Sequence, residues 1–154
     1  MLYVAITLGV GIGNTFANED GAAFKFYSSD KSFADAKFDL ENAIIEKGLK
    51  IDYAGDPGRM LQRTADDVDG SGQIYKGSAY MQFCSALVSR KAMKADPRNI
   101  AFCPYTVYVF ETVADPGVTR LGYRVASWPG PEESNQALDE INELLDDIVR
   151  VAAE

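Results

Sequence analysis

Cys84 and Cys103 are the residues of this chain best suited to chemistry, because its 154 residues include no histidine. Without imidazole, the chain alone cannot form a Ser-His-Asp or Cys-His catalytic group, and zinc or haem sites with histidine ligands are also excluded. General acid–base catalysis would fall to carboxylates, lysine, tyrosine or cysteine. The composition therefore favours a non-catalytic role, and we assign no catalytic residue.

Three roles remain open for the two cysteines. Residues 85–102 separate them, so the chain has neither C-x-x-C spacing nor the C-x-x-C-H haem-attachment motif. In an oxidising compartment the first role is a structural disulfide, and the second is a pair of buried thiols in the core. The third is a thiolate site for copper or haem, with Met60, Met81 or Met93 as a soft second ligand. Only this third role would require a cofactor.

The disulfide is our first prediction for these cysteines. Each cysteine ends an apolar stretch, and a predicted helix with an Asp96-Pro97 stop lies between them. The chain can therefore turn back and bring the two ends together. Closing a loop of about 20 residues would stabilise the fold by about 3 kcal/mol in the chain-entropy model.

The formal net charge of −8 argues against polyanionic binding partners. Nucleic-acid affinity rests on lysine and arginine, and the densest cationic stretch, residues 89–94, holds only Arg90, Lys91 and Lys94. The composition therefore argues against nucleic acids, and also against anionic membrane surfaces.

Four arginines are candidates for binding an anion. Arg120 and Arg124 are expected to share one strand face, and Arg59 and Arg63 lie in a predicted short helix. Guanidinium groups suit carboxylates and phosphates, because they can donate two parallel hydrogen bonds. The alternative is that these arginines pair with the many acidic side chains of the surface, which would contribute little to stability.

The N-terminal segment predicts export. Residues 1–13 are apolar or small and uncharged, Thr15-Phe16-Ala17 resembles a cleavage site, and the polar Asn18-Glu19-Asp20 follows. We therefore predict a signal peptide over residues 1–17, followed by a single domain over residues 18–154 in the periplasm or another exported compartment. The apolar run is too short for a membrane span, so we expect no membrane association after cleavage.

Hydrophobic periodicity predicts an α+β domain. Strands are expected near residues 22–28, 49–53, 73–84, 106–111 and 119–126, with helices near 33–47, 59–65 and 85–95. The clearest element is a last helix with an acidic face and an apolar stripe that includes Ile141, Leu144, Leu145 and Ile148. Because strands and helices alternate, we predict a mixed sheet with helices packed mainly on one face.

Several segments together resemble a two-cysteine, exported branch of the domain-of-unknown-function 302 family. They are Met60–Thr64, Tyr80–Ala86, Phe102–Tyr105 and Leu121–Arg124. The resemblance implies a compact α+β fold of the TATA-binding-protein-like class and a tendency to form dimers. It supplies no catalytic residues, and a fold likeness to a DNA-binding protein does not by itself imply DNA binding.

These observations lead to one expected function and one alternative. We expect a non-catalytic periplasmic accessory or binding module that forms a homodimer and binds a small ligand or a partner protein. A dimer interface through a sheet edge or an apolar face is favoured by the aromatic residues Tyr75, Tyr80, Tyr105, Tyr108, Phe110 and Tyr123. The alternative is a copper or haem protein that uses the cysteine thiolates in a redox pathway.

Overall fold

The computed structural model describes residues 19–21, 23–68, 70 and 72–154, so the predicted signal peptide lies outside the described residues. Its strands are β1 (Glu19–Gly21), β2 (Phe24–Ser29), β3 (Ile51–Gly55), β4 (Tyr75–Phe83), β5 (Tyr105–Thr112) and β6 (Thr119–Arg124). Its α-helices are α1 (Phe33–Glu46), α2 (Pro57–Arg63), α3 (Ala86–Ala95) and α4 (Glu132–Ala153). Short 3₁₀ helices cover Ala65–Asp67 and Pro97–Phe102.

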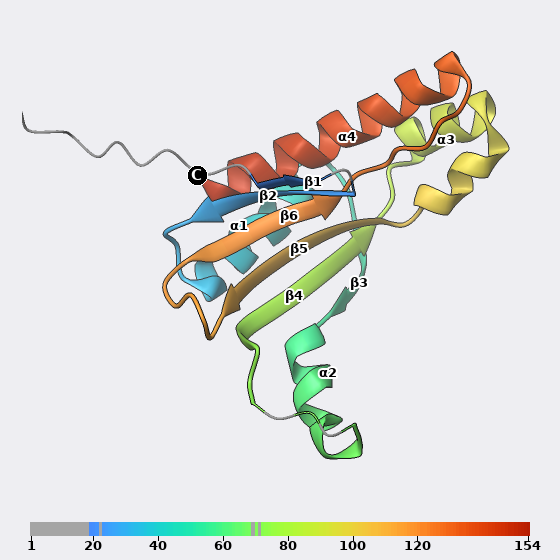
Figure 1. The fold of residues 1–154 in the computed structure, drawn as a ribbon. Helices are drawn as coiled ribbons and strands as arrows, with labels where there is room; N and C mark the ends of the chain where they lie inside the picture. Colours follow the sequence, from blue (N-terminus) through green and yellow to red (C-terminus); the bar gives the residue numbers. More distant parts are fainter. Residues whose placement is uncertain (1–18, 22, 69, 71) are drawn as a thin grey trace, which may run out of the picture.

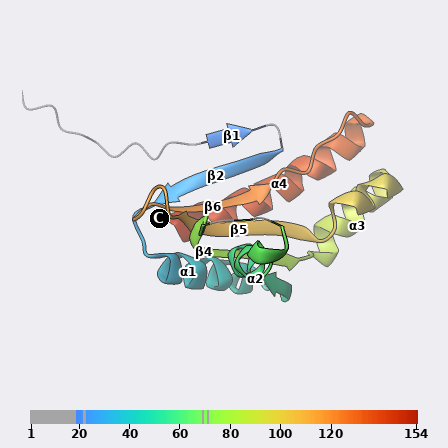
Figure 2. The same ribbon diagram turned by 60° about the horizontal axis from the view of Figure 1, so that its bottom comes forward.

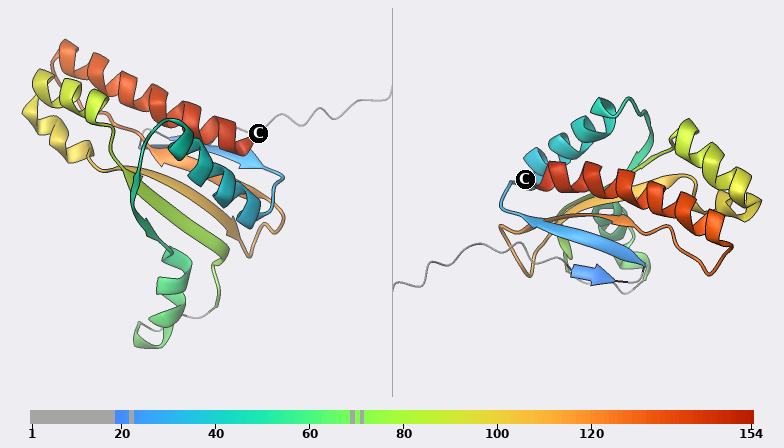
Figure 3. Two further views of the ribbon diagram at one scale, coloured as in Figure 1. Left: turned by 180° about the vertical axis from the view of Figure 1, so that it is seen from behind. Right: turned by 90° about the horizontal axis from the view of Figure 1, so that it is seen from above.

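The strands form one sheet in the order β1-β2-β6-β5-β4-β3. Helices α1 and α4 lie together on one face of it, and α3 extends beyond one end of β4 (Figures 1 and 3). The predicted α+β class and the placement of the helices mainly on one face are therefore confirmed.

The sheet is antiparallel throughout, which corrects the prediction of a mixed sheet. The physical reason lies in the strand order. Strands β2 and β3 run in the same direction, as the α1 crossover between them requires, but β6, β5 and β4 are inserted between them. The two parallel strands therefore never pair, and each is hydrogen-bonded to an antiparallel neighbour.

Local sequence explains the main helices. Ser32 caps α1 by accepting a hydrogen bond from the Asp35 backbone N–H at 3.2 Å. The stripe predicted for α4 is confirmed, since Ile141, Leu145 and Ile148 are fully buried in the core and Leu144 packs at its margin.

Asp146 connects α4 to the helix-covered face of the sheet. Its carboxylate accepts hydrogen bonds from the Tyr27 hydroxyl at 2.6 Å and the Tyr123 hydroxyl at 3.2 Å, and pairs with Lys25 at 2.8 Å. Burial alone would raise the pKa of this carboxyl, but hydrogen bonds from Lys25 and Tyr27 outweigh burial and lower the pKa below its ordinary value of 3.8. The ionised carboxylate is therefore the form that stabilises the fold.

We expect Asp146→Asn to lower the free energy of unfolding by about 1.5 kcal/mol at pH 7, since it removes charge-assisted hydrogen bonds. The carboxylate contribution is present above its unfolded pKa of about 3.9 and is lost as the pH falls through the lower folded pKa. The difference from the wild type should therefore shrink below about pH 4, as urea unfolding at pH 7 and pH 3 would measure. Glu143→Gln, on the exposed side of the same helix, is the control, and a deficit for Asp146→Asn that grows in acid would contradict this account.

Candidate functional site: an aromatic face of the sheet

The face of the sheet opposite α1 and α4 is open across β2, β6 and β5 in the part of the chain that the structure describes (Figures 1 and 2). Strand pleating directs alternate side chains to this face, and many of them are aromatic. We define the aromatic cluster as Phe24, Phe26, Tyr75, Tyr108 and Phe110. Beyond it, Tyr53 and Tyr80 contact each other with ring centroids 5.8 Å apart.

The rings of the aromatic cluster touch one another both within β2 and across strands. Phe26 lies 5.1 Å from Phe24, 5.5 Å from Phe110 and 6.4 Å from Tyr108, measured between ring centroids. Tyr75 meets the Phe110 ring edge to face at 5.8 Å. Cross-strand aromatic pairs of this kind stabilise a sheet, so the cluster is held in place before any ligand arrives.

Gly122 allows Phe26 to take its place in the cluster. The two residues face each other directly across β2 and β6. A Cβ atom at Gly122 would come within 2.1 Å of the Phe26 ring, so any side chain here would displace the ring from the surface of β6. Packing of the Phe26 ring therefore explains why a glycine occupies this position inside a strand.

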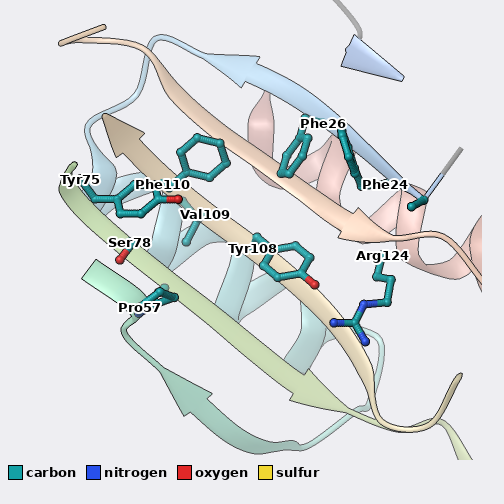
Figure 4. A pocket seen from close by; sticks show the side chains of 11 residues that line it. Phe24, Phe26, Pro57, Tyr75, Ser78, Tyr108, Val109, Phe110 and Arg124 are labelled. Carbon is teal, nitrogen blue, oxygen red and sulfur yellow. The ribbon is translucent and has the colours of Figure 1, made fainter. Parts of the chain in front are cut away.

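The aromatic cluster surrounds a depression of about 450 Å³ (Figure 4). Its lining is apolar apart from the Tyr75, Tyr108, Ser78 and Arg124 side chains, and no acidic residue is part of it. Arg124 lies at one end, where the Tyr108 hydroxyl points toward it (Figure 4). A concave, mainly apolar site of this size with few polar groups is typical of small-molecule binding.

A second depression, of about 850 Å³, lies on the other side of Pro57 and Ser78, between α2 and the sheet. Arg59 and Arg63 line it, together with the Tyr53 and Tyr80 rings. The hydrogen bond that the neutral Tyr80 hydroxyl shares with Tyr53 raises the pKa of Tyr80 above its ordinary value of 10.0, so this hydroxyl stays protonated at neutral pH.

Helix α2 is anchored beside the site through its first turn. Asp56 caps the helix by accepting from the Arg59 backbone N–H at 3.0 Å, and it also accepts from the Ser78 hydroxyl at 2.9 Å. The Ser78 oxygen in turn accepts from the Gly58 backbone N–H at 2.7 Å. Ser78 is therefore already engaged and offers little to a ligand.

The four candidate arginines are not brought together. Arg120 and Arg124 do share the open face of β6, but Arg120 pairs with Asp115 at 2.9 Å. Arg59, Arg63 and Arg124 are exposed and make no ion pair with any described residue. Of these three, only Arg124 lies against the aromatic cluster.

The predicted disulfide is present. Cys84 and Cys103 are bonded, with their Cα atoms 6.4 Å apart. Neither sulfur is then available as a thiolate. Met81 is buried in the core and Met60 is on α2, which packs near Ser78 rather than near the Cys84 end of β4, while Met93 is on α3. Within the described ranges no group of three or more histidine, cysteine, aspartate or glutamate side chains could hold a metal ion.

The aromatic residues singled out in the sequence divide between the two faces. Tyr75, Tyr80, Tyr108 and Phe110 lie on the open face, whereas Tyr105 and Tyr123 are buried under the helices. Sequence reasoning missed Phe24 and Phe26 as site residues, although their alternation with charged and polar neighbours identified a strand. The signal that could have found them is Gly122 within a strand, since such a glycine often receives a ring from its neighbour.

The α+β fold of this chain is shared with a solved structure. The crystal structure of an uncharacterised conserved protein DUF302 from Bacillus stearothermophilus superposes with a TM-score of 0.68 at 12% identity, covering 86% of this chain and 99% of that one. Residues 24–154 match the family described as "Domain of unknown function DUF302", so the chain belongs to this family, as the sequence resemblance predicted. No curated protein matches the chain in sequence.

Proposed function

We propose that this protein is an exported, non-catalytic binding module that acts as a homodimer and binds a small molecule on the open face of its sheet. The observation that carries the proposal is the apolar depression inside the aromatic cluster, with Arg124 at its end, a cation that pairs with no described residue. Large rings left in water are unfavourable, so their concentration around one concavity favours a binding role.

The disulfide supports the exported location. Disulfides persist in oxidising compartments, and Cys84 and Cys103 form one. None of the described helices is long and apolar enough to cross a membrane. Together with the predicted signal peptide over residues 1–17, the disulfide favours the periplasm or a similar compartment.

The homodimer is supported by α2 and the segment after it. Helix α2 buries none of its residues and extends from one end of the sheet (Figure 1). Met60 and Leu61 are exposed there, as are Val68 and Ile74 in the following segment. We propose that a second copy covers these apolar side chains, since a two-fold dimer brings the same apolar patch of both copies together.

Native mass spectrometry of the protein purified from its exported compartment tests both parts of the proposal. We expect a dimer mass and a bound small organic molecule that is released on collisional activation. Tyr108→Ser should remove the molecule and keep the dimer, because it opens the aromatic cluster. Leu61→Asp should give monomers, because it places a charge within the proposed interface.

Leu87 provides the matched control for both variants. It is 81% exposed on α3, at the opposite end of β4 from α2 (Figure 1). Leu87→Ser and Leu87→Asp should keep both the dimer and the molecule. A wild-type protein that is monomeric and free of any organic molecule would refute the proposal, while a bound copper ion or haem would favour the thiolate alternative.

A further inference from the structure

We propose that the ligand is a small organic monocarboxylate, whose carboxylate pairs with Arg124 and whose apolar body lies on the aromatic cluster. This inference rests on the proposed function, since it assumes that the open face is the binding surface. It adds the chemical class of the ligand and its orientation.

The charge of the site selects an anion. Arg124 is the single charged residue among those lining the depression, and no described residue pairs with it. A guanidinium donates two parallel hydrogen bonds, which match the two oxygens of a carboxylate. The protein carries a net charge of −8, and a guanidinium without a described partner beside an apolar surface can attract a negative group to this depression.

The same lining limits the ligand to one negative charge. The other polar groups are hydroxyls, and Ser78 is already occupied by Asp56 and Gly58. The Tyr108 hydroxyl points toward Arg124 and can donate to the same carboxylate (Figure 4). A nucleotide or a dicarboxylate would leave further charges on aromatic rings without a partner, which is costly.

The shape of the site fixes the orientation. Phe24 and Arg124 are directly paired across β2 and β6, so the cation lies at the same end of the sheet as the outermost ring. From there the depression continues over Tyr108 toward Phe110 and Tyr75, which are apolar along most of their surface (Figure 4). A ligand with its charge at one end and an apolar chain or ring system behind it fills this path.

The inference is tested by adding two acids and their uncharged counterparts to isotope-labelled protein and measuring the changes in amide chemical shift. The pairs are 1-naphthoate with 1-naphthylmethanol and octanoate with octan-1-ol, so that aromatic and acyl bodies are compared directly. We expect at least one acid to bind about tenfold more tightly than its alcohol, which is the usual gain from a charged hydrogen bond. The shifts should map to β2, β5 and β6.

Two variants separate the charge from the surface. Arg124→Gln should lower the affinity of the acid about tenfold, to that of the alcohol, while the alcohol is unaffected. Arg90→Gln, an exposed arginine on α3 without a described partner, is the matched control and should change neither affinity. Phe24→Ser should weaken acid and alcohol alike, because it removes apolar contact.

The outcomes distinguish the inference from the proposed function beneath it. If acids and alcohols bind the open face equally, or Arg124→Gln leaves the acid unaffected, the monocarboxylate is wrong but the binding face stands. If none of the probes shifts the amide signals of the open face, the monocarboxylate proposal is also overturned. The native mass spectrum then decides whether the open face binds any small molecule. A preference for naphthoate or for octanoate would assign an aromatic or an acyl body within the proposed class.

Discussion

Replacing both cysteines with serine is expected to lower the free energy of unfolding by about 3 kcal/mol. The reason lies in the strand pairing, because Phe83 and Tyr105 form the last pair between β4 and β5. Cys84 directly follows Phe83, and Cys103 lies just before Tyr105 in the chain. The disulfide therefore closes the loop that contains α3 and residues 97–102, at the point where the pairing of β4 with β5 ends. A loop of this length loses considerable freedom in the unfolded chain when it is closed.

Urea unfolding of three samples measures this effect. The oxidised wild type, the reduced wild type and the double variant Cys84→Ser/Cys103→Ser are compared at one pH. We expect the two samples without the bond to unfold at similar urea concentrations, well below the oxidised protein. If the reduced wild type is as stable as the oxidised form, the bond has no structural role, and a redox function of the two sulfurs becomes the better explanation.

The local elements of this fold were largely predictable from sequence. The strand near residues 22–28, the helix near residues 33–47 and the stripe of α4 each depend on residues close in the chain, and each prediction agrees with the structure. The strand order could not be predicted in this way. The order depends on which strands the core brings together. Strands β6, β5 and β4 lie between β2 and β3 in the sheet, although all three come later in the chain than β2, α1 and β3.

The candidate site shows the same limit. The aromatic load of the strands was recognised, but which rings lie on the open face depends on the registers of β4, β5 and β6. Arg120 and Arg124 are equivalent by spacing, yet the hairpin places Asp115 beside Arg120 alone. Arg124 therefore has no ion-pair partner among the described residues, because the turn that carries Asp115 lies beside Arg120 instead.

The core beneath this site gives the second large effect. Leu145 is 1% exposed on α4 and lies beside Phe102, Tyr105 and Ala126, under the sheet end that carries Arg124. Leu145→Ala is expected to cost about 3 kcal/mol, because a buried leucine loses both its transfer energy and its packing contacts. Leu144 is the same residue type one position earlier, at the margin of the core, so Leu144→Ala should cost about 1 kcal/mol. Equal losses for the two variants in urea unfolding would mean that α4 does not pack on the sheet through its predicted face.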